Sequence, residues 1–523
     1  MVRQKSEDRV VPKGRRKPIP TRGGEPREGG KAIPVDEQTR QLGLFSGTAE
    51  VCAAQAPRVD GGTDVGLPAA APRATPKPKN KEETVALATM EEVTSRLREA
   101  FEKVASNRGA AGPDGESIAE VRKHLDELLP ALSRELLAGT YRPGEIRRVW
   151  IPKATGGQRG LGIPNVIDRV VQEAVRAVLE PLYEPTFHDG SHGFRPGRSC
   201  HSAIARARAY VDDGYDWVVD IDLENFFDKV NHQRLMARLA QRVVNHDLLV
   251  LIGRMLKARV VMPDGVVVST AEGVPQGGPL SPLLSNIVLD ELDRELAQRG
   301  HCFVRYADDA NIYVRSEQAG KRVMESVTRF IERRLRLKVN ASKSAVARPS
   351  ERHFVGFRLE RKPEDGEVEV LLSKRSKERI DNKICEMTPR TWGQSLRACI
   401  AKVNVYLVGW LGFFGVCTAG IEYALHGLDA HIRRRLRAIQ LAHWKSKRTI
   451  ARRLVKNGVK PKTAWKNVYE GRKSLWTLAH SPAVNRALRN AYFAERGLIS
   501  LEYRWKESRR PIIAPAQLTL SLG

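Results

Sequence analysis

The stretch Phe303–Tyr313 reads FVRYADDANIY and places two adjacent carboxylates between two apolar, strand-forming runs. This pattern predicts a β-hairpin whose tip carries Asp308 and Asp309. Adjacent carboxylates repel each other, and a cation between them relieves the repulsion. An isolated Asp-Asp turn is usually only a solvated hairpin tip, so the pair needs a further acidic partner before it indicates a site.

A second acidic segment lies upstream. Trp217–Asp228 reads WVVDIDLENFFD, again an apolar strand that ends in acids. A strand-end Asp that faces an Asp-Asp hairpin is what two-metal phosphoryl transfer needs, because the carboxylates hold two Mg²⁺ ions roughly 3.5–4 Å apart. Strand alternation puts Asp220 and Asp222 on the same face, so the pattern alone leaves both as candidates.

Several motifs resemble those of one family. Tyr306–Asp309 resembles the YxDD box of reverse transcriptases, and the segment around Asp222 resembles their first palm motif. Between them, Gly273–Asn286 (GVPQGGPLSPLLSN) resembles the second palm motif of bacterial group II intron reverse transcriptase/maturases. Further similar blocks extend from about Asn107 to Leu498: Asn107–Gly115, Ile151–Pro164, Gly193–Ser199, Leu337–Lys343 and Phe354–Phe357.

The resemblance implies an α+β fold, namely a right-hand polymerase with fingers and palm, an α-helical thumb/maturase domain and a basic C-terminal region. The expected boundaries are 1–82 for a disordered tail, 83–215 for an N-terminal extension and fingers, 216–360 for the palm, 361–428 for the thumb/maturase domain and 429–523 for the basic region. Periodicity predicts strands at Ile146–Ile151 and Leu161–Ile163. It predicts helices at Met90–Ser106, Val166–Leu182, Ser199–Val211, Ser281–Gln298, Gly320–Arg336, Lys374–Lys402 and Val403–Val416.

The resemblance also implies the catalytic residues. Asp222, Asp308 and Asp309 are expected to hold two Mg²⁺ ions, and the carbonyl of Leu223 could complete the shell of the second ion. Asp222 is preferred over Asp220 because the family's aromatic gate lies five residues beyond the catalytic Asp.

Phe227 lies at that gate position. It is expected to exclude a 2′-hydroxyl and so to favour dNTPs; the alternative is a core aromatic. Lys343 matches a palm lysine, for which the resemblance implies a role as general acid toward pyrophosphate, with phosphate contact or solvent exposure as alternatives.

Four further residues are expected to lie at the nucleotide or the nascent base pair: Lys153, Arg159, Gln276 and Gly277. Lys153 and Arg159, on a predicted hairpin loop, are suited to clamp the triphosphate. The family generally has Arg-Pro-Leu-Gly where this chain has Arg159–Gly162 (RGLG), a departure that loosens the turn. Gln276 and Gly277 are expected to let the backbone approach the nascent base pair, because glycine lacks a Cβ.

The charge of the chain indicates a polyanionic partner. Lys and Arg number 88 against 61 Asp and Glu, a net charge of +27. From Asp429 to Lys473 fifteen Lys and Arg face two acids, interleaved with Trp444, Trp465 and Tyr469. Cations match phosphates and aromatic faces stack on unpaired bases. The predicted nucleic-acid contacts are Arg433, Arg434, Arg435, Arg437, Lys445 and Arg448.

Arg195 and Arg198 form a second candidate contact, with the template backbone. For these two arginines the alternative is a fold-stabilising pair with an acid. The expected partners of the chain are group II intron RNA or another RNA template, a DNA primer or target, and dNTPs.

Six widely spaced cysteines without a C-x-x-C pair argue against disulfides and structural zinc and fit a cytoplasmic location. Larger relatives end in an HNH nuclease with paired cysteines, a pattern that this sequence does not show. The apolar segment Val403–Cys417 is too short to span a bilayer, so we expect a buried helix and no membrane.

The expected function is an RNA-directed DNA polymerase that also binds intron RNA as a maturase and supports splicing and retrohoming. Two alternatives stay open from the sequence. One is a domesticated enzyme of DNA repair or phage defence. The other is an RNA-binding splicing factor whose polymerase is dispensable.

Overall fold

The acidic segments lie in a four-stranded antiparallel sheet of order β6-β7-β3-β8. The strands are β3 (Trp217–Ile221), β6 (Cys302–Tyr306), β7 (Asp309–Val314) and β8 (Ala345–Ala347). Strands β6 and β7 pair from Cys302↔Tyr313 to Tyr306↔Asp309, which leaves Ala307 and Asp308 as the two-residue turn. The predicted hairpin is confirmed.

The computed structural model describes residues 88–152, 156–471 and 474–509. The expected tail at 1–82 and Lys153 lie outside the described residues.

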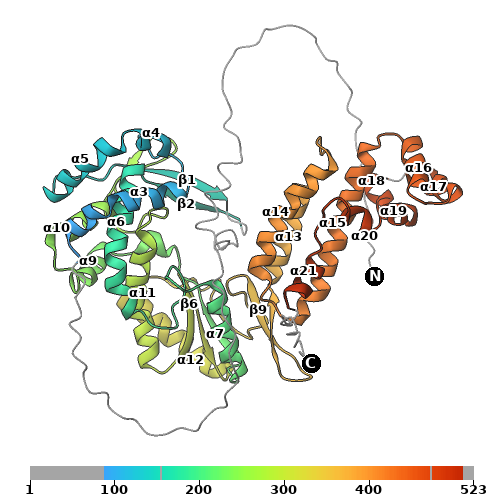
Figure 1. Cartoon of the computed structure of the whole chain (residues 1–523). Coiled ribbons are helices and arrows are strands. Elements are labelled where there is room, and N and C mark those ends of the chain that lie inside the picture. Colours follow the sequence, from blue (N-terminus) through green and yellow to red (C-terminus); the bar gives the residue numbers. More distant parts are fainter. Residues whose placement is uncertain (1–87, 153–155, 472–473, 510–523) are drawn as a thin grey trace, which may run out of the picture. The chain divides into compact units, whose positions relative to one another are not determined.

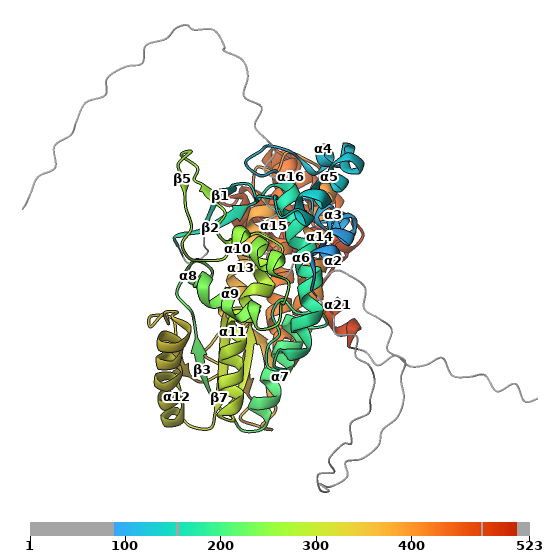
Figure 2. The same cartoon turned by 90° about the vertical axis from the view of Figure 1, so that its left-hand side faces the viewer.

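The two faces of this sheet have different neighbours, because successive side chains of a strand point to opposite faces. Val219 and Ile312 belong to one hydrophobic core with helices α11 (Ser281–Gln298) and α12 (Glu317–Phe330). Val218 and Tyr313, one residue along, belong to another core with α7 (Cys200–Asp212). Figure 2 shows α12 beside β3 and β7. By alternation the α7 face also carries Asp220, Asp222, Asp309 and Asn311.

A second sheet has the order β2-β1-β4-β5. Its strands are β1 (Ile146–Pro152), β2 (Gln158–Ile163), β4 (Val260–Val261) and β5 (Val267–Val268). The predicted hairpin of β1 and β2 is confirmed, with Ile151 opposite Arg159. Around this part of the chain lie α2 (Met90–Ser95), α3 (Leu97–Ser106), α4 (Ile118–Lys123), α5 (Leu125–Leu137), α6 (Val166–Tyr183), η2 (Glu184–Thr186), α8 (Phe226–Lys229), α9 (His232–Ala240) and α10 (His246–Leu256).

Two predicted helices are interrupted. The segment Met90–Ser106 divides into α2 and α3 at Arg96. The segment Lys374–Lys402 divides into α13 (Lys374–Met387) and the start of α14 (Leu396–Phe414). Pro389 lies in the interruption, where it cannot continue a helix. After α12 the chain forms a short π-helix, η3 (Ile331–Leu335), inside the predicted helix Gly320–Arg336.

The helix α14 is, among the described residues, the one helix long and apolar enough to cross a membrane by length and composition. The sequence predicted an apolar segment that starts at Val403 and is too short to span a bilayer. That length is corrected, because α14 begins seven residues before Val403. One face of α14, with Leu407 and Trp410, is buried in a core shared with α13 and α15 (Glu422–His443). Figure 1 shows these three helices side by side. A core helix passes the same length test.

The remaining elements complete the C-terminal part. The hairpin β9 (Phe357–Arg361) and β10 (Val368–Leu372) packs against α7. After α14 come η4 (Ala419–Ile421), α15, α16 (Lys447–Lys456), α17 (Pro461–Tyr469), α18 (Leu475–Leu478), α19 (Pro482–Ala487), α20 (Asn490–Ala494) and α21 (Leu501–Ser508).

Candidate active site

The turn that carries Asp308 has a strained backbone. Ala307 has φ of 58°, in the left-handed region that a non-glycine residue rarely adopts. Gly193 packs directly behind it: a Cβ on Gly193 would lie 2.2 Å from the Ala307 nitrogen. The segment GFRPGRS therefore begins with glycine for a steric reason, since a larger residue would displace the turn.

The pKa values of Asp308 and Asp309 are raised. Burial is the largest cause of the raised pKa of Asp308, and the charge of Asp222 adds to it. Burial also raises the pKa of Asp309 well above its usual range, and Asp220, Asp308 and Asp222 add to that rise. The structure therefore brings together acids that are far apart in the sequence, and a bound cation would relieve their repulsion.

Asp222 is fixed through its backbone by the segment after η3. Its carbonyl accepts a 2.8 Å hydrogen bond from the Asn340 nitrogen, and its own nitrogen donates to Ser344 Oγ at 3.0 Å. Lys343 Nζ lies 3.4 Å from Asp222 Oδ2. The predicted residues Asp222 and Lys343 are thus neighbours in space, although 121 positions separate them.

Asp220 has a different environment from Asp222. Its side chain is 11% exposed, against 39% for Asp222, and it pairs with Arg352. Arg352 also donates a 2.6 Å hydrogen bond to the Lys343 carbonyl. Burial raises the pKa of Asp220, and the guanidinium of Arg352 opposes that rise. The carboxylate of Asp220 is therefore paired with Arg352 inside the protein, while the carboxylate of Asp222 is exposed enough to contact a ligand.

Arg159 links the second sheet to the acids. Its Nε donates a 2.7 Å hydrogen bond to Gln276 Oε1, and its positive charge opposes the raised pKa of Asp308. The predicted residues Arg159 and Gln276 therefore lie together beside the turn. Gly277, with φ of 131°, packs against β2, where a Cβ would lie 2.1 Å from the Gly162 carbonyl oxygen. The close backbone approach at Gly277 is thus to β2.

Phe227 is packed at the same loop. It is 7% exposed, and its ring lies 5.1 Å from that of Phe226 at an angle of 70°. The Phe227 carbonyl accepts a 2.6 Å hydrogen bond from the Val274 nitrogen, which joins α8 to the segment Gly273–Asn286. Leu223, the predicted carbonyl ligand, bridges to Val339 between Asp222 and α8.

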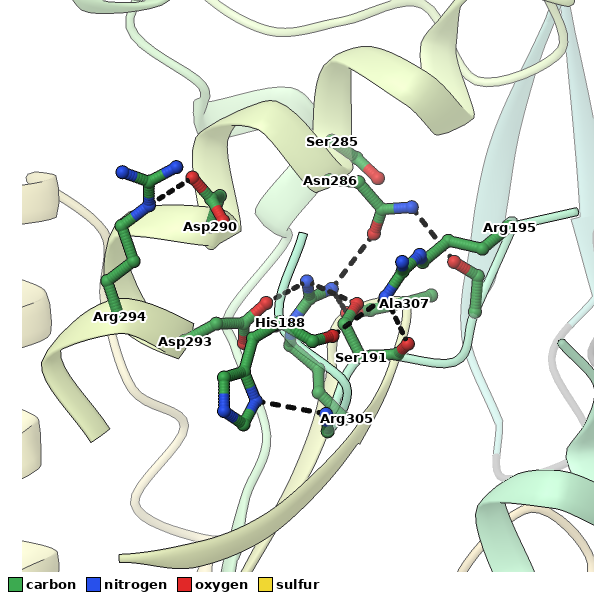
Figure 3. Close-up of polar contacts among 12 residues, drawn as sticks. His188, Ser191, Arg195, Ser285, Asn286, Asp290, Asp293, Arg294, Arg305 and Ala307 are labelled. Carbon is green, nitrogen blue, oxygen red and sulfur yellow. Dashed lines mark hydrogen bonds and ion pairs between the residues drawn. The ribbon is translucent and has the colours of Figure 1, made fainter. Parts of the chain in front are cut away.

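A buried ion pair holds the turn from the opposite face of the sheet. Arg305 and Asp293 of α11 are 1% and 0% exposed, and two hydrogen bonds of 2.8 and 2.5 Å join them. Arg305 also donates to the Ala307 carbonyl at 2.7 Å, to Asn286 Oδ1 at 3.0 Å and to Ser191 Oγ at 2.7 Å (Figure 3). Arg305 thus holds the carbonyl of Ala307, the strained residue next to Asp308, in place.

For Arg195 the fold-stabilising alternative applies. Its side chain is 4% exposed, pairs with Glu184, and donates to the His188 and Ser191 carbonyls at 2.7 and 2.9 Å (Figure 3). Its donors face inward, so the expected contact with the template backbone is corrected for Arg195. Arg198 pairs with Asp189 at 2.6 Å and is 26% exposed.

The arginines of α15 do not all point to solvent. Arg435 donates to the Cys385 and Thr388 carbonyls at 3.0 and 2.7 Å and so caps the C-terminal end of α13. Arg437 donates to the Leu488 carbonyl at 3.0 Å, and burial lowers its pKa to about 10. The expectation of a nucleic-acid contact is corrected for these two residues, because the fold uses their guanidinium groups.

The four other predicted contacts are not used to bind backbone carbonyl groups among the described residues. Arg434 stacks over the Trp476 ring at 4.0 Å, and Arg433 is half-buried. Lys445 and Arg448 are exposed.

The chemistry of the acid cluster fits a metal ion. Within the described ranges no three His, Cys, Asp or Glu side chains are arranged as a ready metal cluster. Asp222, Asp308 and Asp309 nevertheless supply the oxygen ligands that Mg²⁺ prefers. The negative charge of Asp222 adds to the raised pKa of both Asp308 and Asp309, so the three carboxylates lie close enough to share a cation.

Sequence reasoning missed three supporting residues: Arg305, Asp293 and Arg352. A signal existed for the first two. Arg305 interrupts an apolar strand, and Asp293 lies with Asn286 and Asp290 at helical spacing on the buried face of α11. Polar residues on a face that is otherwise apolar indicate a buried network. Arg352 carries no such signal, since it lies in an irregular segment.

Replacing Arg305 by Met should lower the free energy of unfolding by about 3–5 kcal/mol, because it leaves Asp293 buried without a partner. The double variant Arg305→Met, Asp293→Leu should regain much of that loss. Arg329→Met is the matched control: its pair with Glu325 is exposed, so its loss should stay below about 1 kcal/mol. Urea unfolding measures all three, and equal losses at positions 305 and 329 would contradict the anchoring role.

Asp309→Asn should raise the melting temperature at pH 8. The folded-state pKa of Asp309 lies above its unfolded-state value, so its ionised form destabilises the fold at high pH. That cost is fully present above the folded-state pKa and disappears as the pH falls toward about 4, the usual value for Asp. The gain should therefore shrink on acidification. Calorimetry across pH tests this, with the exposed Asp126→Asn as control; a variant less stable than wild type at pH 8 refutes it.

Comparison with known proteins gives the family. A family model described as reverse transcriptase (RNA-dependent DNA polymerase) matches residues 151–359, and one described as group II intron, maturase-specific domain matches residues 377–457. Protein YkfC of Escherichia coli (strain K12) is 33% identical over 350 residues, which cover 59% of this chain and 89% of YkfC.

Two further relatives carry intron names. The group II intron-encoded protein LtrA of Lactococcus lactis subsp. cremoris is 38% identical over 207 residues, 38% of this chain and 33% of LtrA. The putative COX1/OXI3 intron 2 protein of Saccharomyces cerevisiae is 26% identical over 409 residues, 66% of this chain and 46% of that protein. The chain thus spans about a third to a half of these two proteins. Motifs, fold and similarity together identify the chain as a member of the group II intron reverse transcriptase/maturase family.

Proposed function

We propose that the chain is an RNA-directed DNA polymerase that also binds group II intron RNA as a maturase and supports splicing and retrohoming. The observation that carries the polymerase is the proximity of Asp222, just after β3, to Asp308 and Asp309 of the β6–β7 hairpin, where its charge adds to the raised pKa of both. The maturase part is supported by the match of residues 377–457 to the maturase-specific domain. Its partners would be the intron RNA or another RNA template, a DNA primer or target, and dNTPs.

Asp222, Asp308, Asp309 and the carbonyl of Leu223 would hold two Mg²⁺ ions. When bound, the ions supply activation of a primer 3′-hydroxyl and neutralise the charge of the leaving pyrophosphate. Asp308, in the turn, lies close enough to Asp222 for the charge of Asp222 to raise its pKa. Asp309, at the start of β7, would have the less direct role.

The neighbours of the acids are suited to hold the nucleotide. Arg159, fixed by Gln276, presents a planar cation to the triphosphate, for which bidentate hydrogen bonds are favourable. Lys343 is 60% exposed beside Asp222 and is available to transfer a proton to the leaving group. Phe227, fixed between α8 and Val274, would limit space at the 2′ position of the sugar.

Primer extension on an RNA template with Mg²⁺ and dNTPs tests the polymerase. Purified wild-type protein should extend the primer. Asp308→Ala should reduce the rate by at least about 100-fold, since the loss of a metal ligand removes several kcal/mol of transition-state stabilisation. Asp365→Ala, an exposed acid between β9 and β10, is the control and should keep full activity. Equal extension by wild type and Asp308→Ala would overturn the proposal.

The gate is tested by competition between nucleotides. Phe227→Ala should increase incorporation of rNTPs relative to dNTPs by about 10-fold or more, because the smaller side chain leaves room for a 2′-hydroxyl. The ratio is measured within one preparation, so partial unfolding of the variant does not affect it. Phe226→Leu, at the adjacent ring, controls for a general packing change. An unchanged ratio in Phe227→Ala rules out the gate.

A further inference from the structure

The helices α16 and α17 carry an exposed pair of stacked aromatic rings. Trp465 and Tyr469 lie one turn apart on α17, with ring centroids 5.5 Å apart and an interplanar angle of 18°. They are 38% and 49% exposed. Ala464 and Val468, on the adjacent face of α17, are buried. The two rings therefore cover no core of their own and form a flat apolar surface, which we term the aromatic pair.

Uncompensated positive charge surrounds the aromatic pair. Residues 447–469 contain eight Lys and Arg and no acid. All eight are exposed, and none forms an ion pair within the described ranges: Lys447, Arg448, Arg452, Arg453, Lys456, Lys460, Lys462 and Lys466. Lys447 Nζ lies 5.6 Å from the centre of the Tyr469 ring, so a cation of α16 directly adjoins the aromatic pair.

Two nearby aromatic residues, Trp444 and Trp476, are occupied. Trp444 is partly buried and packs against the hydrophobic core. Trp476 is covered by the guanidinium of Arg434, 4.0 Å above its ring. Of the three aromatic residues that interleave the basic sequence from Asp429 to Lys473, only Trp465 and Tyr469 therefore remain available to a ligand.

We propose that Trp465 and Tyr469 form a stacking site for unpaired bases of single-stranded RNA, with the cations of α16 and α17 on the flanking phosphates. Aromatic faces accept any base, while a row of cations follows the backbone. This inference rests on the proposed maturase function. RNA is favoured over DNA because α16 lies within residues matched by the maturase-specific domain, and α17 packs on α16.

Binding of the full-length protein to labelled oligonucleotides tests the site. The probes are an unstructured 20-nucleotide RNA, a blunt RNA duplex, and DNA of the same sequence as the single strand. Trp465→Ala and Tyr469→Ala should each weaken binding to the single-stranded RNA by about 5- to 150-fold, the range for one base–aromatic stack. Binding to the duplex should stay within about twofold, because its bases are already stacked.

Conservative and distant variants control this result. Trp465→Phe keeps a ring and should recover most of the affinity. Tyr423→Ala removes an aromatic residue that is 88% exposed on α15 and lies outside residues 447–469, so it should bind as wild type.

Salt titration separates stacking from charge. Lys462→Gln should make the slope of log affinity against log salt shallower by about 0.7, the value for one single-strand phosphate contact. Trp465→Ala should weaken binding without changing that slope.

Three outcomes would overturn the site: wild-type affinity in both alanine variants, an equal loss on the duplex, or a loss confined to DNA. Asp308→Ala distinguishes failure of this site from failure of the proposed polymerase. It should lose primer extension but keep the affinity for single-stranded RNA, so the two functions are measured independently.

Discussion

The buried pair of Arg305 and Asp293 is the constraint on which the catalytic geometry depends. The sheet presents its acids on the α7 face, while Arg305 points to the other face and contacts α11. Through the Ala307 carbonyl it fixes a left-handed residue in the two-residue turn. A buried ion pair adds little net stability, because desolvation offsets most of the attraction. Its contribution here is positional: it ties the turn to α11 and so fixes where Asp308 lies.

The cluster of acids at the turn destabilises the fold locally. Desolvation and like charges raise the pKa of Asp308 and Asp309, which disfavours the ionised forms that a metal site needs. Cations from separate segments reduce this cost without removing it. Arg352 is paired with Asp220, Arg159 lies near Asp308, and Lys343 lies beside Asp222. The charge that remains is complementary to divalent ions, which is the usual state of a site arranged for phosphoryl transfer.

In the basic C-terminal region, cations that are close in the sequence do not all lie on one surface. In α15 the helical repeat sends Arg435 and Arg437 toward the ends of α13 and α19, where they bind carbonyl groups. In α16 and α17 every cation is exposed and lacks an acidic partner among the described residues. Two neighbouring segments of similar composition therefore differ in role: the first holds helices together, and the second leaves its charge for a polyanion.

The sequence by itself determined the hairpin, the second acidic strand and the family, because short motifs with fixed spacing encode local turns and the residues of the chemistry. It also placed the helix Ser281–Gln298 at its observed bounds, since Pro282 in its first turn and Gly300 just after its end mark where it starts and stops. Only the tertiary structure decided which charged residues face inward. Spacing gives the face of a helix or strand but not what packs against it, so the pairing of Asp220 with Arg352 could not be read from the chain. The same limit applied to Arg195, whose partner Glu184 is set by the fold of an irregular loop.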